Sequence, residues 1–369
     1  MTSVSSRPPP PPPPPVFAVV GSGYWGKNIV RTLGELCTVA VDRVVCDSDA
    51  AARERVEQQG IRTVTSLADL VNIERLVGVF IATPAPTHYE VARWCLEHGI
   101  HTYVEKPLTL NSHQARALHD LAQRVERVLM VGHLLRYHPL VEHMVRTVTD
   151  RVTFGRILYI ECTRQSMGIV RDDENVLWSF CPHDVSVALA LLDANAPVGH
   201  RVDLACESAS ESVLLPEKTL PPPLGPARNS DAVRCVLSDK NSKAQVFLNA
   251  NWMHPAKQQR IVVVGDRGAM VLDDTECWER KLRVTTCLRR GGGGESGGRA
   301  LLSSAEIDWT YPGEWIPAAA PLERECEHFV QCCMGVHAAA RTGGVEGIRV
   351  IDVIEDCFRT ARRHPVVLE

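Results

Sequence analysis

Two residues of this chain, Lys106 and His183, are of types that move protons to and from a hydroxyl group. Lys106 follows Glu105 at the end of an expected buried strand, and Pro107 restrains the lysine to an extended backbone. As an ammonium group a lysine stabilises a developing alkoxide, and with a lowered pKa it helps to move the hydroxyl proton. The alternative is a surface lysine paired with Glu105.

His183 stands between Pro182 and Asp184. Proline is best tolerated in the first turn of a helix, so we expect a helix to begin here and to run through residues 184–194. The helix dipole would then lower the pKa of His183 and keep the imidazole neutral near pH 7. Asp184 would cap the helix or orient the imidazole. A histidine alone is usually structural, but opposite a lysine across a cofactor cleft it is the better candidate for a base.

A glycine-rich turn follows the first expected strand, where Gly21, Gly23 and Gly26 form the pattern G-x-G-x-x-G. Gly21 permits the tight turn, Gly23 lets the backbone approach a pyrophosphate, and Gly26 allows close packing of helix on strand. The start of the next helix favours the phosphates. Tyr24 and Trp25 lie in this turn and are expected to contact the cofactor. The alternative is a glycine turn that binds no nucleotide.

An acidic residue, Asp47, ends the second expected strand, about 20 residues after the glycine-rich turn. Its carboxylate would accept hydrogen bonds from a ribose 2′-hydroxyl and repel a 2′-phosphate. The expected cofactor is therefore NAD, and NADP is disfavoured.

Further candidate cofactor contacts lie where later strands end at the same edge of the sheet. Thr83 and Pro84 close one strand, and His88 follows at the start of a helix. His88 is expected either to contact the cofactor or to cap the helix. Glu105 and Lys106 close the next strand, and both are expected to contact the cofactor.

Apolar runs separated by amphipathic segments between residues 16 and 135 are typical of a parallel sheet covered on both faces. We therefore expect an α/β fold that begins with an NAD-binding Rossmann domain over 16–135, a doubly wound parallel sheet. The expected strands are 16–20, 41–47, 76–83, 101–107 and 127–133, and the expected helices are 25–36, 49–59, 87–98 and 112–125.

Residues 136–369 change to runs of strands, which favours an α+β domain with an open, largely antiparallel sheet. We expect it to bind substrate, to carry its two last helices near the domain junction, and to form a homodimer or homotetramer that covers the open sheet face. The expected strands are 155–165, 200–208, 231–238, 243–252, 259–264 and 268–273, the helices 139–149, 184–194, 321–336 and 345–362, and the insertions 216–230 and 289–300.

The first 15 residues include the unbroken run Pro8–Pro15, which favours a stiff polyproline II segment. It is either a disordered tail or a ligand for grooves of the SH3 or WW kind.

The composition, with 45% hydrophobic and 23% charged residues, is that of a globular protein. A net charge of -4 offers no basic field for nucleic acid or an anionic membrane. The 13 scattered cysteines predict reduced thiols, no metal site and a cytoplasmic location. No signal peptide is recognised, and no stretch approaches the roughly 18 apolar residues of a membrane span.

Six stretches, in this order, resemble the Gfo/Idh/MocA family of NAD(P)-dependent sugar oxidoreductases over residues 16–365. Three of them, around GYWGKN, GHLLRYHP and WSFCPHD, resemble the branch that oxidises UDP-N-acetylglucosaminuronate at C3. The six stretches are GSGYWGKNIVR, ATPAPTHYEVA, VEKPLTL, VGHLLRYHP, ENVLWSFCPHDVS and PLERECEHF.

The resemblance implies hydride transfer from a sugar carbon to nicotinamide, with Lys106 and His183 catalytic in roles that could be shared or exchanged. It also implies that Arg164, Arg171 and Asn175 contact the sugar or nucleotide-sugar substrate. Many relatives have an aspartate four residues before the histidine, whereas this chain has a serine there. Another sugar, a polyol, a dihydrodiol or a tetrapyrrole is an alternative substrate, and a non-catalytic NAD-binding sensor or scaffold is an alternative function.

Overall fold

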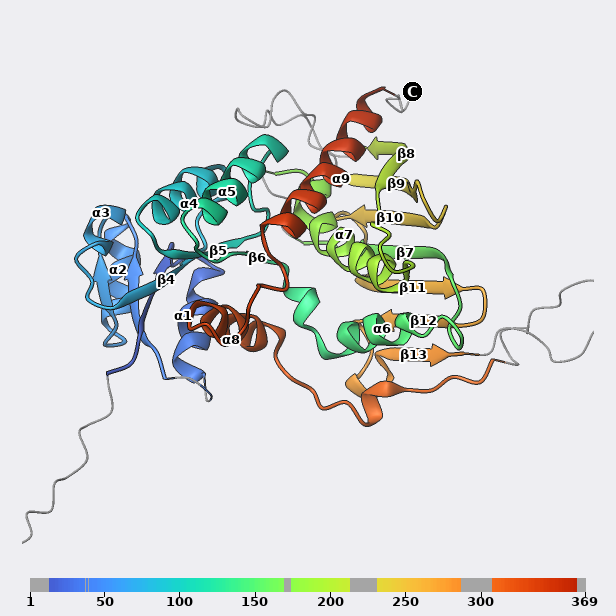
Figure 1. Ribbon diagram of the computed structural model, residues 1–369, viewed down its shortest axis with the longest axis horizontal. Helices are drawn as coiled ribbons and strands as arrows, with labels where there is room; N and C mark the ends of the chain where they lie inside the picture. Colours follow the sequence, from blue (N-terminus) through green and yellow to red (C-terminus); the bar gives the residue numbers. More distant parts are fainter. Residues whose placement is uncertain are drawn as a thin grey trace, which may run out of the picture.

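The computed structural model describes two sheets that lie side by side, with the last helix of the chain running between them (Figure 1). Most of the proline-rich tail and both expected insertions lie outside the described residues. The described residues are 13–36, 38, 40–168, 174–212, 231–286 and 307–363.

The first sheet has six parallel strands in the order β3-β2-β1-β4-β5-β6. Its direction of winding reverses between β1 and β4, which leaves a crevice at the carboxyl ends of these strands. This order confirms the predicted doubly wound sheet; only the three-residue β3 was missed. The strands are β1 (Val16–Val20), β2 (Asp42–Cys46), β3 (Arg62–Val64), β4 (Leu76–Ile81), β5 (His101–Glu105) and β6 (Leu129–Gly132).

Helices cover both faces of this sheet. One of them comes from far along the chain: α8 (Pro321–Cys333) packs beside α1 and against β4. Its Phe329 meets the Phe80 ring edge-on, with centroids 4.8 Å apart, and Tyr103 packs against both rings. The buried apolar side of α8 thus completes the core of the first sheet. The remaining helices of this sheet are α1 (Gly26–Glu35), α2 (Ala50–Glu57), α3 (Leu67–Leu70), α4 (His88–Glu97) and α5 (Ser112–Arg124).

The second sheet has seven strands in the order β13-β12-β11-β7-β10-β9-β8. All neighbours are antiparallel except β7 and β10, which confirms a largely antiparallel sheet. β8 lies later than its predicted range, and β13 was not predicted. The strands are β7 (Ile157–Gln165), β8 (Leu204–Ser212), β9 (Ala232–Asp239), β10 (Gln245–Asn251), β11 (Gln258–Gly265), β12 (Ala269–Asp273) and β13 (Leu282–Thr285).

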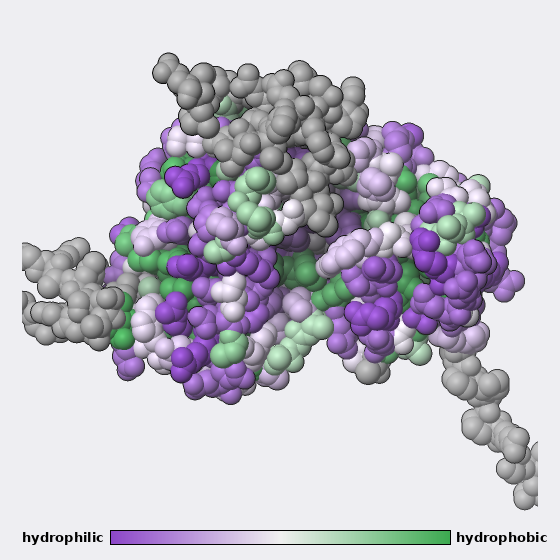
Figure 2. Space-filling view, turned by 180° about the vertical axis from the view of Figure 1, so that it is seen from behind, coloured by the Kyte–Doolittle hydropathy of each residue, from purple (hydrophilic) through white to green (hydrophobic). Residues whose placement is uncertain are grey.

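One face of the second sheet is covered by α6 (Pro139–Thr149) and α7 (Val176–Asn195). The opposite face has half-buried apolar side chains, among them Tyr159 and Phe247, whose ring centroids are 6.0 Å apart. Figure 2 shows apolar and polar residues mixed on this side of the molecule. None of the described helices packs on this face, as the sequence predicted.

Helix α7 corrects the prediction for His183. The helix begins at Val176 and contains Pro182 in its interior, so His183 and Asp184 lie in mid-helix and not at its N-terminus. Proline in a helix removes one backbone hydrogen bond, but here the helix is held by packing on every side. Among the described helices, α7 is also long and apolar enough to cross a membrane, yet 83% of that window is buried inside the fold. It is the core helix of the second sheet.

The last helix, α9 (Gly344–Arg363), packs against β8 and α7 on one side and against α5 on the other. Arg116 of α5 makes two hydrogen bonds to Asp352, and Glu355 accepts hydrogen bonds from the Ser112 amide and hydroxyl. This helix therefore ties the helical layer of the first sheet to the edge of the second.

Candidate active site

The glycine-rich turn lies between β1 and α1, and its three glycines meet different constraints. Gly21 has a φ of +87°, and a Cβ there would lie 2.9 Å from the carbonyl oxygen of Ala82. A Cβ on Gly26 would lie 1.9 Å from the carbonyl oxygen of Gly21. A Cβ on Gly23 would meet no atom within 4 Å. Gly21 and Gly26 are needed for close packing of the turn, whereas Gly23 faces open space that a pyrophosphate would fill.

The start of α1 is suited to an anion. Trp25, which precedes the helix, makes no capping hydrogen bond with its side chain. The Lys27 and Asn28 amides bond to the carbonyls of Gly23 and Trp25, so the attraction for a negative group comes mainly from the positive end of the helix dipole. Beside the turn, Asp47 accepts hydrogen bonds from the amide and the hydroxyl of Ser22, at 2.8 and 2.7 Å. These hydrogen bonds lower the pKa of Asp47 against the opposing effect of burial. Asp47 is thus a carboxylate at the place expected for the adenosine ribose.

Trp25 and Glu105 connect the glycine-rich turn to the end of β5. The Trp25 indole donates a hydrogen bond to Oε1 of Glu105, which also accepts one from the Tyr103 hydroxyl at 3.0 Å. Burial raises the pKa of Glu105 to about 7, although these hydrogen bonds and Lys106 oppose the shift. Gly132 makes room for the pair, because a Cβ there would lie 2.5 Å from the Tyr103 hydroxyl. Tyr24, in contrast, is 78% exposed.

His88 supports the backbone of the cleft. The side chain is 1% exposed, and its ring nitrogens lie 2.7 Å from the carbonyl oxygen of Pro107 and 2.8 Å from that of Thr83. Burial lowers its pKa, so one nitrogen donates to one of the two carbonyls. His88 thereby joins the end of β4 to the turn after Lys106. Pro84 follows Thr83 and begins a short 3-10 turn, η1 (Ala85–Thr87).

Both candidate catalytic residues are connected to α7, since His183 belongs to this helix and Lys106 bonds to it. The Lys106 ammonium group donates a hydrogen bond to the carbonyl oxygen of Ser179, at 3.0 Å. Ser179 lies one helical turn before His183, so both residues are on the same side of α7. Burial lowers the pKa of His183 well below its ordinary value, and the charges of Lys106 and Arg164 add to this effect. The predicted low pKa thus has burial as its cause, not the helix dipole.

The His183 ring carries an unsatisfied polar atom. Its Nδ1 is buried and has no hydrogen-bond partner among the described residues. A buried polar atom without a partner costs free energy and is a common sign of a site that a ligand completes.

Arg164 of β7 binds Asp184 of α7 with two hydrogen bonds, from Nε at 3.1 Å and from Nη2 at 2.7 Å. The Asp184 charge raises the pKa of Arg164 despite burial. Asp184 therefore pairs with β7 instead of capping a helix. Asn175 is 1% exposed and caps α7, accepting a hydrogen bond from the Trp178 amide at 3.1 Å. Arg171 lies outside the described residues.

Glu325 of α8 is a residue that sequence reasoning missed. It is fully buried, and neither of its carboxyl oxygens has a hydrogen-bond partner among the described residues. Burial and the nearby Glu105 raise its pKa well above the ordinary value. The only signal in the sequence was an acidic residue on the apolar side of an expected helix.

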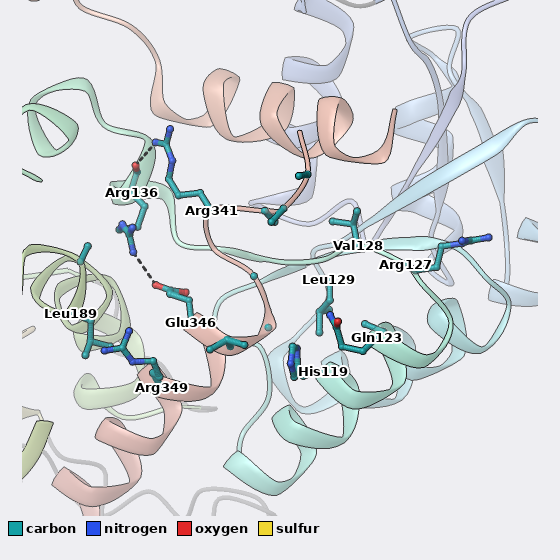
Figure 3. A pocket seen from close by; sticks show the side chains of 18 of the residues that line it. His119, Gln123, Arg127, Val128, Leu129, Arg136, Leu189, Arg341, Glu346 and Arg349 are labelled. Atoms are coloured by element: carbon teal, nitrogen blue, oxygen red, sulfur yellow. Dashed lines mark hydrogen bonds and ion pairs between the residues drawn. The ribbon is translucent and has the colours of Figure 1, made fainter. Parts of the chain in front are cut away.

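A separate cavity of about 800 Å³ lies between α5, α7 and the start of α9 (Figure 3). Arg136 and Glu346 line one side of it and form an ion pair at 3.5 Å, and Arg349 pairs with Asp193. Leu129, at the amino end of β6, lines the wall. None of the predicted cofactor contacts lines this cavity, because the glycine-rich turn lies at the opposite ends of the strands.

The six-stranded parallel sheet and its glycine-rich turn define a Rossmann domain of the dinucleotide-binding kind. Residues 16–133 match the family described as GFO_IDH_MocA, oxidoreductase family, NAD-binding Rossmann fold. The match covers the first sheet and its helices, and it describes this part of the chain as an NAD-binding Rossmann domain of that family.

Relatives show which enzymes the chain is similar to. UDP-N-acetylglucosamine 3-dehydrogenase of Acidithiobacillus ferrooxidans is 29% identical over 48% of this chain and 54% of its own length, so the match spans about half of that relative. Inositol 2-dehydrogenase of Rhodococcus jostii is 26% identical over 78% of this chain and 76% of its own length. The fold is similar to that of the WlbA dehydrogenase of Chromobacterium violaceum, solved with NADH and UDP-GlcNAcA. The TM-score is 0.73 at 18% identity, covering 99% of this chain and 100% of the other.

Proposed function

We propose that this protein oxidises a hydroxyl-bearing carbon of a sugar, with NAD as hydride acceptor, and that Lys106 and His183 are its catalytic residues. The observation that carries the proposal is the unpaired, buried Nδ1 of His183 beside the ammonium group of Lys106. A neutral imidazole and a fixed cation are what the removal of a hydroxyl proton needs.

The residues of the chain would divide the work as follows. His183, kept neutral by burial and by the Lys106 charge, accepts the hydroxyl proton. Lys106, held by Ser179, stabilises the negative charge that develops on the same oxygen. Asp47 and the Gly23 turn hold the cofactor, and the bound nicotinamide supplies the hydride acceptor.

The substrate that we propose is a nucleotide-sugar uronate such as UDP-N-acetylglucosaminuronate, oxidised at C3. The relatives that act on or bind UDP-sugars support this choice. Arg171 and Asn175 remain proposed substrate contacts. Arg164 can still offer Nη1, since its pair with Asp184 uses Nε and Nη2, and a guanidinium suits a carboxylate or a pyrophosphate.

A polyol is the second candidate substrate, favoured by the similarity to inositol 2-dehydrogenase over most of the chain. A dihydrodiol remains a further alternative. A protein that binds NAD without catalysis is the competing function. We further propose a cytoplasmic location, which suits the free thiols of the described cysteines.

The test is the formation of NADH from NAD with UDP-N-acetylglucosaminuronate, UDP-N-acetylglucosamine and myo-inositol as separate substrates. If the uronate has the highest kcat/KM of the three substrates, the result supports the proposal. If inositol has the highest kcat/KM, a polyol is the substrate. The non-catalytic function would be favoured if the wild type and His183→Ala both bind NAD in calorimetry and neither turns over any of the sugars. Mass spectrometry of molecules that co-purify with the protein identifies the natural ligand.

A further inference from the structure

Three cysteines that the proposed reaction does not use lie close together at the edge of the second sheet. Cys206 belongs to β8, Cys235 to β9 and Cys357 to α9, three elements that lie side by side in Figure 1. The Cys206 amide bonds to Asp356, the chain neighbour of Cys357, and Cys235 is a diagonal neighbour of Cys206 on the β8–β9 ladder. We call these three residues the thiol cluster. The chain thus brings together cysteines that are more than 25 residues apart in sequence.

Cys206 is the accessible member of the cluster. It is partly exposed, whereas Cys235 and Cys357 are buried. Its amide donates a hydrogen bond to Oδ2 of Asp356 at 2.7 Å, which fixes Cys206 against α9. In the neutral form, its thiol lies 3.4 Å from the carbonyl oxygen of Ser208 and can donate to it. A small solute can therefore reach Cys206 before it reaches the other two.

The cluster stabilises the ionised form of Cys206. The nearby thiols of Cys235 and Cys357 and the Thr360 hydroxyl lower the pKa of the Cys206 thiol, while burial and Asp356 oppose the shift. The same contacts raise the pKa of Cys357, so it remains a thiol. A thiolate next to a neutral thiol is the arrangement of a nucleophilic cysteine with a resolving partner.

The strand register favours Cys357 over Cys235 as that partner. On the β8–β9 ladder, Cys206 lies opposite Leu237 and Cys235 lies opposite Ala209, so the two cysteines are diagonal neighbours. Diagonal Cα atoms are about 7–8 Å apart, and a disulfide usually needs about 4.4–6.8 Å. Cys357 approaches from the helix above the sheet and is free of this restriction.

We propose that Cys206 is a peroxide-sensitive site that forms a disulfide with Cys357. The Cys206 thiolate attacks one oxygen of a hydroperoxide, the O–O bond breaks, and a sulfenic acid and the reduced hydroxide or alkoxide result. The Cys357 sulfur then attacks the sulfenic sulfur, a disulfide forms, and water leaves. The peroxide accepts two electrons and two thiols lose them. No metal is involved, and the described residues contain no group of three His, Cys, Asp or Glu placed to hold one.

The Cys206–Cys357 disulfide would fix the position of α9, which contacts both halves of the molecule. α9 also packs against α5 of the first sheet, and a disulfide to β8 would fasten it to the second. Oxidation is therefore expected to raise the Tm of the protein.

The experiment treats the full, reduced chain with stoichiometric hydrogen peroxide and follows it by thiol titration and by non-reducing peptide mapping. The expected result is the loss of two titratable thiols per chain and a Cys206–Cys357 linked peptide, with a Tm increase that dithiothreitol reverses. Cys357→Ser should instead accumulate a sulfenic acid on Cys206, trapped by dimedone. Cys277→Ser is the matched control, because Cys277 is exposed and lies outside the cluster; it should behave as the wild type.

Some results would overturn the inference. One is that Cys206 stays reduced while Cys277 is oxidised. Another is that the mapped disulfide joins Cys206 to Cys235 or joins two chains. The wild-type peptide map decides between these results even if a serine variant does not fold.

Discussion

Lys106, at the end of a strand of the first sheet, donates a hydrogen bond to the carbonyl oxygen of Ser179, on the core helix of the second sheet. That contact fixes the lysine one helical turn from His183. The candidate active site exists only where the two sheets meet.

The catalytic assignment predicts that Lys106→Ala and His183→Ala each lower kcat by about 10²- to 10⁴-fold, the usual contribution of a proton-transfer group. NAD affinity should change little, because the phosphates and ribose are held by other residues. Steady-state kinetics and calorimetry measure the two quantities. Lys240→Ala, a surface lysine paired with Asp203, is the control; wild-type turnover in either catalytic variant would refute the assignment.

Replacement of Asp47 tests the ribose contact. Asp47→Ala removes a charged acceptor, so NAD should bind less tightly by about 1.5–3 kcal/mol, about tenfold to a hundredfold in Kd. Discrimination against NADP should also fall, because the repulsion of a 2′-phosphate is gone. Asp42→Ala, at the other end of the same strand, should leave both Kd values unchanged. An unchanged NAD affinity in Asp47→Ala would mean that the ribose lies elsewhere.

Glu105 should make the glycine-rich turn sensitive to pH. Its pKa is raised to about 7 by burial, so the carboxylate that accepts from Trp25 is present above pH 7 and is lost as the pH falls below it. The fluorescence difference between wild type and Trp25→Phe should therefore titrate with a midpoint near pH 7. Glu105→Gln should abolish this titration. A difference signal that is flat with pH in the wild type would contradict the raised pKa.

Glu325→Gln should stabilise the protein at neutral pH. Burial raises the folded-state pKa of Glu325 above its unfolded value of about 4.5, so the folded protein retains a proton that the unfolded chain releases. Stability from this group is complete at low pH and declines as the pH rises above about 4.5. Urea unfolding at several pH values should show an advantage of Glu325→Gln that grows with pH. Glu323→Gln, exposed on the same helix, should show none.

The open face of the second sheet predicts self-association. We expect a homodimer or homotetramer in which Tyr159, Phe247 and their neighbours are covered by another copy. Phe247→Asp should yield monomers in light scattering, because a carboxylate cannot be buried there without a partner. Arg31→Asp, exposed on α1, should keep the wild-type mass. A monomeric wild type would refute the prediction.

Local patterns predicted most of the fold. The alternation of apolar strands and amphipathic helices placed β1, β2, β4, β5 and β6 with α1, α2, α4 and α5 close to their observed limits. The short elements β3 and β13 escaped because three or four residues carry too little periodicity. Pro182 was placed wrongly because propensity puts proline in a first turn, whereas packing keeps it inside α7.

The sequence alone determined the glycine-rich turn, Asp47 after β2 and Lys106 after β5, since each depends on neighbours within one βα unit. The tertiary structure alone decided what surrounds them. Burial, not a helix dipole, keeps His183 neutral, and α8 returns to place Glu325 behind Glu105. The thiol cluster joins three elements in the same way. Such relationships depend on contacts between residues far apart in the chain, and no local pattern of residue types encodes which distant segments will meet.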